Sequence, residues 1–171
     1  MPPSPPKVFH TQSPSSRQCV RIALSNAMQK THTISCQSFQ NEVKTIEEGA
    51  GSVIANFYNN LYDKKPKSDN CPCWQENWSL TVALEYLKDH KMKGDEIEIA
   101  KANWEKGHFL ILAKNIGASG NHALAVVDGW LLDSLSDRPV RFQENFDTAV
   151  SEKYEIMKVW EIKDADPKSK S

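Results

Sequence analysis

The spacing of apolar residues changes once along the chain, and this change constrains the fold more than any other feature. Up to about residue 90, apolar side chains recur every three to four residues, which predicts helices. After Gly94 they alternate or form short runs, which is typical of strands. Helices first and strands second predict an α+β fold, in which helices pack on an antiparallel sheet.

The expected elements follow from this pattern. Helices are expected over residues 18–30, 37–62 and 79–90, with Gly49-Ala50-Gly51 turning the second into a helical hairpin or kinked arm. Side chains that favour helix N-caps are Ser35 for the second helix and Asn77 or Ser79 for the third. Strands are expected over residues 96–99, 108–114, 122–127, 129–135 and 155–162. Asp128-Gly129, between two apolar strands, predicts a hairpin turn.

The length of 171 residues suits one domain. Residues 1–16 hold five of the nine prolines and form a Pro/Ser-rich leader, whose end, about residues 8–16, we expect to dock at Val8 and Phe9. The folded domain is predicted to span residues 17–162. Residues 163–171 are predicted to form a polar tail.

Charge and composition exclude several classes of protein. With 21 basic and 22 acidic residues, the net charge of −1 gives no electrostatic argument for binding nucleic acid. No apolar run reaches the roughly 18 residues that cross a bilayer, and the N-terminus lacks a secretory signal, so we expect a cytoplasmic protein with reduced thiols and no membrane partner. Cys71-Pro72-Cys73 is spaced too closely for a zinc knuckle, so neither a metal nor a cofactor is expected.

Three residues are candidates for nucleophilic catalysis. Cys19 begins the first apolar helix, where unpaired backbone N–H groups and the helix dipole favour the thiolate. His122 opens a strand, and Asp133 lies beyond the Asp128-Gly129 turn, so the hairpin would bring the two face to face. Each residue alone is more often structural, but together they form the Cys-His-acid pattern of papain-like enzymes.

These residues lie in a sequence that resembles the Josephin family of papain-like cysteine deubiquitinases over about residues 8–162. The resemblance in the first part rests on Phe9-His10, Gln12, Cys19, Leu24, Asn26 and Gln29. In the second part it rests on a helix like Asn77-Trp78-Ser79 through Leu87, a strand from Phe109 to Ala113, and on His122, Trp130 and Asp133-Ser134-Leu135. The chain departs from the family at Ala123, where an aromatic residue is usual.

The resemblance implies a deubiquitinase with Cys19 as nucleophile, His122 as base and Asp133 as the residue that orients the base. It implies Gln12 as the oxyanion donor, with Gln18 as the alternative because Gln12 lies seven residues before Cys19. A helical arm would contact ubiquitin or polyubiquitin, and the candidate substrate-binding residues are Phe57, Tyr58 and Trp130.

The resemblance also implies a monomer in the cytoplasm, with the nucleus or a host cytosol as alternatives. Two other functions stay open: a papain-like protease or acyltransferase effector with another substrate, and a non-catalytic ubiquitin-binding module.

Overall fold

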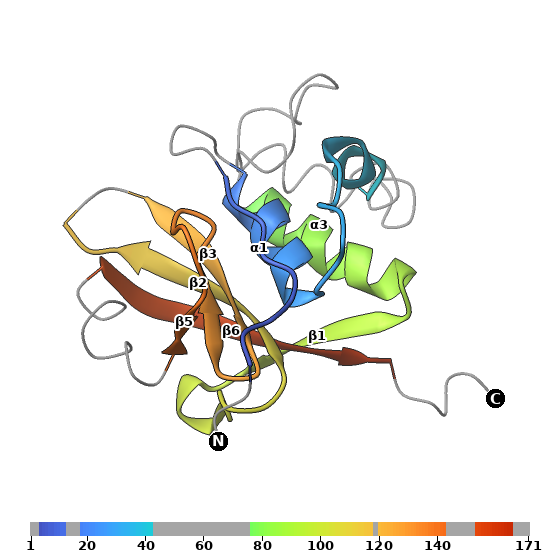
Figure 1. The fold of residues 1–171 in the computed structure, drawn as a ribbon. Coiled ribbons are helices and arrows are strands. Elements are labelled where there is room, and N and C mark those ends of the chain that lie inside the picture. The colour runs from blue at the N-terminus through green and yellow to red at the C-terminus, as the bar shows by residue number, and fades with distance from the viewer. Residues whose placement is uncertain (1–3, 13–17, 43–75, 118–119, 143–152, 166–171) are drawn as a thin grey trace.

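The structure, a computed structural model, describes residues 4–12, 18–42, 76–117, 120–142 and 153–165. Over this part of the chain, helices pack on one face of a six-stranded antiparallel sheet (Figure 1). The predicted α+β class is therefore confirmed. The helical arm beyond residue 42, with Phe57 and Tyr58, and Cys71-Pro72-Cys73 lie outside the described residues.

The helices are α1 (Cys19–Ala27), a helical segment at residues 36–42, α3 (Glu76–Asp89) and the 3-10 turn η2 (Ile99–Lys101). The strands are β1 (Met92–Ile97), β2 (His108–Asn115), β3 (Asn121–Val127), β4 (Trp130–Leu132), β5 (Val140–Arg141) and β6 (Tyr154–Asp164). Their order in the sheet is β1-β6-β2-β3-β4-β5. The last strand of the chain, β6, therefore lies in the sheet between the first two, β1 and β2.

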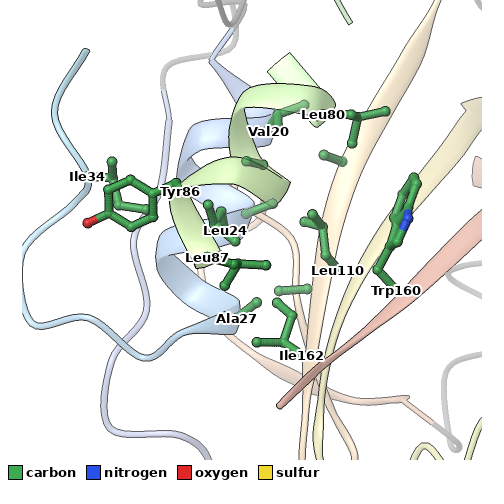
Figure 2. Close-up of a cluster of buried hydrophobic side chains, with 14 of the residues drawn as sticks. Val20, Leu24, Ala27, Ile34, Leu80, Tyr86, Leu87, Leu110, Trp160 and Ile162 are labelled. Atoms are coloured by element: carbon green, nitrogen blue, oxygen red, sulfur yellow. The ribbon is translucent and has the colours of Figure 1, made fainter. Parts of the chain in front are cut away.

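Both faces of the central strands are buried, which explains why β2 and β3 read as continuous apolar runs. Leu110 and Ala125 point toward α1 and α3, whereas Ile111 and Leu124 point into a second core on the opposite face. Figure 2 shows the helix-side core, in which side chains of both helices meet those of the sheet. It includes Val20, Leu24, Leu80, Leu87, Leu110, Trp160 and Ile162.

The helix α1 ends at Ala27, earlier than the predicted residue 30. Gln29 takes a left-handed conformation with φ 55°, and the Lys30 N–H donates to the Ser25 carbonyl at 3.0 Å. This Schellman-type ending usually needs glycine. Here the Gln29 side chain holds it, because its amide donates to the Val8 carbonyl at 2.9 Å and to the Asn26 carbonyl at 2.8 Å.

The end of the leader lies along α1 and is held by side-chain amides. The Asn26 amide accepts from the His10 N–H at 2.7 Å and donates to the His10 carbonyl at 3.0 Å. Gln29 binds the backbone of Val8 in the same two-way manner. Phe9 packs against the helix-side core, so the segment docks at Val8 and Phe9, as its sequence led us to expect.

The Asp128-Gly129 turn is confirmed, because Val127 pairs with Trp130 across it. Both turn residues have positive φ, 48° and 85°, as a two-residue hairpin turn of this hand requires. The Ser35 cap is also confirmed, since its hydroxyl accepts the Ser38 N–H at 3.1 Å.

Other boundaries were wrong. Asn77 and Ser79 lie inside α3, which already includes Glu76, so neither caps it. The strand β1 begins at Met92 and ends before η2, because its pairing with β6 rather than its own alternation sets its limits.

Two further strands differ from expectation at their ends. The strand expected over residues 129–135 ends at Leu132, because the chain turns at Asp133. Lys163 and Asp164 pair with β1 and belong to β6, so the polar tail does not begin at residue 163. The two-residue strand β5 was not predicted. No helix in the described ranges has the length and hydropathy needed to cross a bilayer.

Candidate active site

One end of the sheet gathers polar side chains from three strands. The strand β3 begins there, β4 ends there before Asp133, and β6 begins there with Tyr154. The direction of α1 brings Cys19 to the same end. His108, at the other end of β2, contacts the Ala27 carbonyl at 2.6 Å through Nδ1, which holds the C-terminal end of α1 away from the site.

His122 and Asp133 form the centre of this cluster. His122 Nε2 lies 2.8 Å from Asp133 Oδ1, and the residues are only 4% and 5% exposed. Their contact agrees with the prediction, but their register does not. The turn pairs Ala125 with Leu132, so the two side chains meet diagonally instead of directly across the hairpin.

Cys19 is the third member of the cluster. It is the first residue of α1, is half-buried, and hydrogen-bonds the His122 side chain. Since Nε2 is used by Asp133, Nδ1 is the ring nitrogen that can exchange a proton with the thiol. The N-cap residue of α1, Gln18, makes no capping hydrogen bond with its own side chain. The three residues can therefore act as nucleophile, base and orienting acid.

The charges of the cluster support one another. Burial alone would lower the pKa of His122, but its hydrogen bonds to Asp133 and Cys19, together with their charges, raise it to about 9. Burial opposes ionisation of Asp133 too, yet the contacts with His122, the Leu135 N–H and Tyr154 hold the pKa of that carboxyl below its ordinary value. At neutral pH the two residues form an imidazolium–carboxylate pair.

Tyr154 belongs to this cluster, although the sequence did not reveal it. Its hydroxyl donates to Asp133 Oδ2 at 3.0 Å, and its ring stacks on His122 with centroids 5.4 Å apart and planes at 23°. Burial and the charge of Asp133 raise the pKa of Tyr154, so the hydroxyl stays a donor. Its only sequence signal is an aromatic residue just before the last predicted strand, 21 residues from Asp133.

The two candidate oxyanion donors have different surroundings. Gln12 donates its backbone N–H to the Ser134 carbonyl at 2.8 Å, and its side-chain oxygen accepts from the Ser134 hydroxyl at 2.5 Å. This contact directs the donor end of the amide away from Ser134, and Ser134 is next to Asp133. Gln18 instead uses its side-chain oxygen to accept from the buried guanidinium of Arg21. In both residues the side-chain oxygen is an acceptor, so the choice between Gln12 and Gln18 stays a prediction.

Trp130, which is a candidate for substrate binding, does not lie with the cluster. It opens β4 beside the hairpin turn and pairs with Val127, at the opposite end of β3 from His122. Its ring packs on the helix-side core and lies 5.4 Å from the guanidinium carbon of Arg141. This packing gives Trp130 a structural role.

Neither a protein-family model nor a curated protein sequence matches this chain.

Proposed function

We propose that the protein is a cysteine-type deubiquitinase, which hydrolyses the isopeptide bond at the C-terminal glycine of ubiquitin. The observation that carries the chemistry is the imidazole of His122, which contacts Asp133 through Nε2 at 2.8 Å and also interacts with the side chain of Cys19. The resemblance to the Josephin family, on Cys19, His122 and Asp133-Ser134-Leu135, supports ubiquitin as the substrate.

In the first half-reaction, the Cys19 thiolate attacks the carbonyl carbon of the terminal glycine of ubiquitin. A carbon–sulfur bond forms, and the carbonyl oxygen becomes an oxyanion. The Gln12 side-chain amide and the Cys19 backbone N–H are the proposed donors to that oxygen. The His122 imidazolium then gives its proton to the lysine nitrogen, the carbon–nitrogen bond breaks, and a thioester remains.

In the second half-reaction, neutral His122 takes a proton from water, and the hydroxide attacks the thioester carbonyl. The carbon–sulfur bond breaks, which releases the C-terminal carboxyl group of ubiquitin and restores the thiolate and imidazolium; the carboxyl group then gives its proton to solvent. Asp133 keeps the imidazole in one orientation and stabilises its charge throughout.

A ubiquitin that carries an electrophile at its C-terminus tests this proposal. We expect one adduct, which mass spectrometry locates at Cys19, and none in the Cys19→Ser or His122→Ala variants. Cys36, the other half-buried thiol of the described segments, is an internal control, because no base is matched to it. The same assay covers Cys71 and Cys73.

The outcomes separate the alternatives. Labelling of Cys19 by a small electrophile but never by the ubiquitin probe would keep a cysteine hydrolase or acyltransferase and discard ubiquitin. Binding of ubiquitin without an adduct would favour a binding module. An adduct at Cys36, Cys71 or Cys73 would mean that the nucleophile is assigned wrongly.

A further inference from the structure

We infer that Tyr154 is a positioning residue of this site, which holds Asp133 with its hydroxyl and His122 with its ring. The inference goes beyond the Cys-His-Asp cluster and rests on the proposed function only for its catalytic meaning. Tyr154 acts through its two neighbours, since one contact goes to the carboxylate and the other to the imidazole.

The carboxylate of Asp133 is bound on both oxygens. Oδ1 contacts His122 Nε2 at 2.8 Å and accepts the Leu135 N–H at 3.0 Å, while Oδ2 accepts the Tyr154 hydroxyl at 3.0 Å. Three contacts fix the plane of the carboxylate. Because Asp133 is almost fully buried, removal of the hydroxyl would leave a charged oxygen without its donor, and the carboxylate would gain freedom to rotate.

The ring of Tyr154 limits the movement of the imidazole. Tyr154 is 9% exposed and packs in the second core, so its own ring has little room to shift. Its backbone is fixed as well, because it pairs with Asn115 on β2 and the Ile116 N–H donates to the Lys153 carbonyl at 2.8 Å. The imidazole therefore packs against a ring that cannot shift. This packing keeps its Nδ1 toward Cys19.

The natural comparison is Tyr86, which is also buried, at 5% exposure, and stacks on a histidine, His90, with centroids 4.0 Å apart. Tyr86 lies on α3 and takes no part in the cluster. Tyr154→Phe and Tyr86→Phe remove the same atom from two tyrosines that are buried and stack on a histidine. A general effect of removing a tyrosine hydroxyl from the fold should therefore appear in both variants, whereas a positioning effect should appear only in Tyr154→Phe.

The first measurement is the rate at which iodoacetamide alkylates Cys19, which needs no ubiquitin. We expect Tyr154→Phe to lower this rate about 10-fold or more, as for loss of one hydrogen bond to a charged group, and Tyr86→Phe to leave it unchanged. In an Asp133→Ala background, Tyr154→Phe should have no further effect, because its contact is already gone. An equal effect in both backgrounds would overturn the inference.

The second measurement is the proton resonance of His122 Nε2–H in nuclear magnetic resonance spectra. A proton held between His122 and Asp133 gives a slowly exchanging downfield signal, which we expect to broaden in Tyr154→Phe and to persist in Tyr86→Phe. A signal that is unchanged in Tyr154→Phe would also overturn the inference. Thermal melting shows whether each variant is folded.

A third measurement serves if Tyr154→Phe does not fold. In the unmutated protein labelled with fluorotyrosine, the fluorine signal of one tyrosine should follow the titration of His122, and this movement should disappear in His122→Ala. No such signal would contradict the inference. On turnover of a ubiquitin substrate, Tyr154→Phe should lower kcat and spare KM. A failed ubiquitin assay with intact effects on alkylation would discard the substrate and keep the positioning role.

Discussion

Replacement of Asp133 by asparagine removes a charge from the site and almost no volume. The variant therefore isolates the electrostatic part of the His122–Asp133 contact. Papain-like sites also use asparagine to orient the base, so the Asp133→Asn variant is expected to keep its fold and activity near pH 6. The effect should appear at alkaline pH, where His122 loses its proton.

The size of the effect follows from the surroundings of His122. Its pKa is about 9 where the ordinary value is 6.5, which corresponds to about 3 kcal/mol in favour of the imidazolium. Burial opposes the imidazolium, so Asp133 and Cys19 supply all of the free energy that favours it. The hydrogen bond and the charge of Asp133 each outweigh those of Cys19. Asp133 thus contributes more of the increase than Cys19 does, and Asp133→Asn, which keeps a hydrogen-bond acceptor but loses the charge, should lower the pKa of His122 by about one.

The assay is kcat/KM for a ubiquitin substrate between pH 6 and pH 10. We expect the alkaline limb near pH 9 in the unmutated protein, and about one pH unit lower in Asp133→Asn. Asp128→Asn is the matched control. It removes the same charge from the hairpin turn, where asparagine also tolerates the positive φ of 48°, and it should leave the limb in place.

The protonation of His122 also affects the stability of the fold. Because folding raises the pKa of His122, its contribution is fully present below about pH 6.5 and is lost as the pH rises through about 9. Between pH 7 and pH 10 the unmutated protein should therefore lose more free energy of unfolding than Asp133→Asn does. An alkaline limb that stays near pH 9 in Asp133→Asn would refute the reasoning.

Three further predictions concern other parts of the chain. Burial and the carboxylate of Asp89 raise the pKa of Glu42 to about 8, so the free energy of unfolding should fall as the pH rises from about 4.5 to 8. In urea denaturation, Glu42→Gln should depend less on pH over this range and should be more stable at pH 8 than the unmutated protein. Gln12→Ala should lower kcat by about 10²–10³ with little change in KM, whereas Gln18→Ala should not; the reverse result would move the oxyanion role to Gln18. Ser35→Ala should cost about 1 kcal/mol in thermal or urea unfolding, because it removes the cap of the helical segment at residues 36–42.

Local signals in the sequence predicted the parts of the fold that local interactions decide. Asp128-Gly129 suits a two-residue turn, and this turn brought His122 and Asp133 into one hairpin. The cap at Ser35 depends on a hydroxyl three residues from its partner, which spacing alone reveals.

Elements that depend on distant partners were not predictable in this way. The first residues of β1, including Gly94, have no strand pattern of their own and become a strand only by pairing with β6. The end of α1 depends on Gln29, whose strained backbone is held by contacts with Val8. The contact of Tyr154 with Asp133 joins residues 21 positions apart, and the spacing of apolar residues does not predict such a contact.

The position of β6 inside the sheet has a consequence for biosynthesis. A ribosome delivers β2 and β3 long before β6, yet β6 is the strand that joins β2 to β1. A nascent chain that stops short of Tyr154 therefore exposes an edge of β2 and an open second core, and Asp133 still lacks its hydroxyl donor. Such a chain should be held by chaperones, and Cys19 in it should not react with the ubiquitin probe. The protein would thus acquire its reactive cysteine only when nearly all of the described chain has left the ribosome.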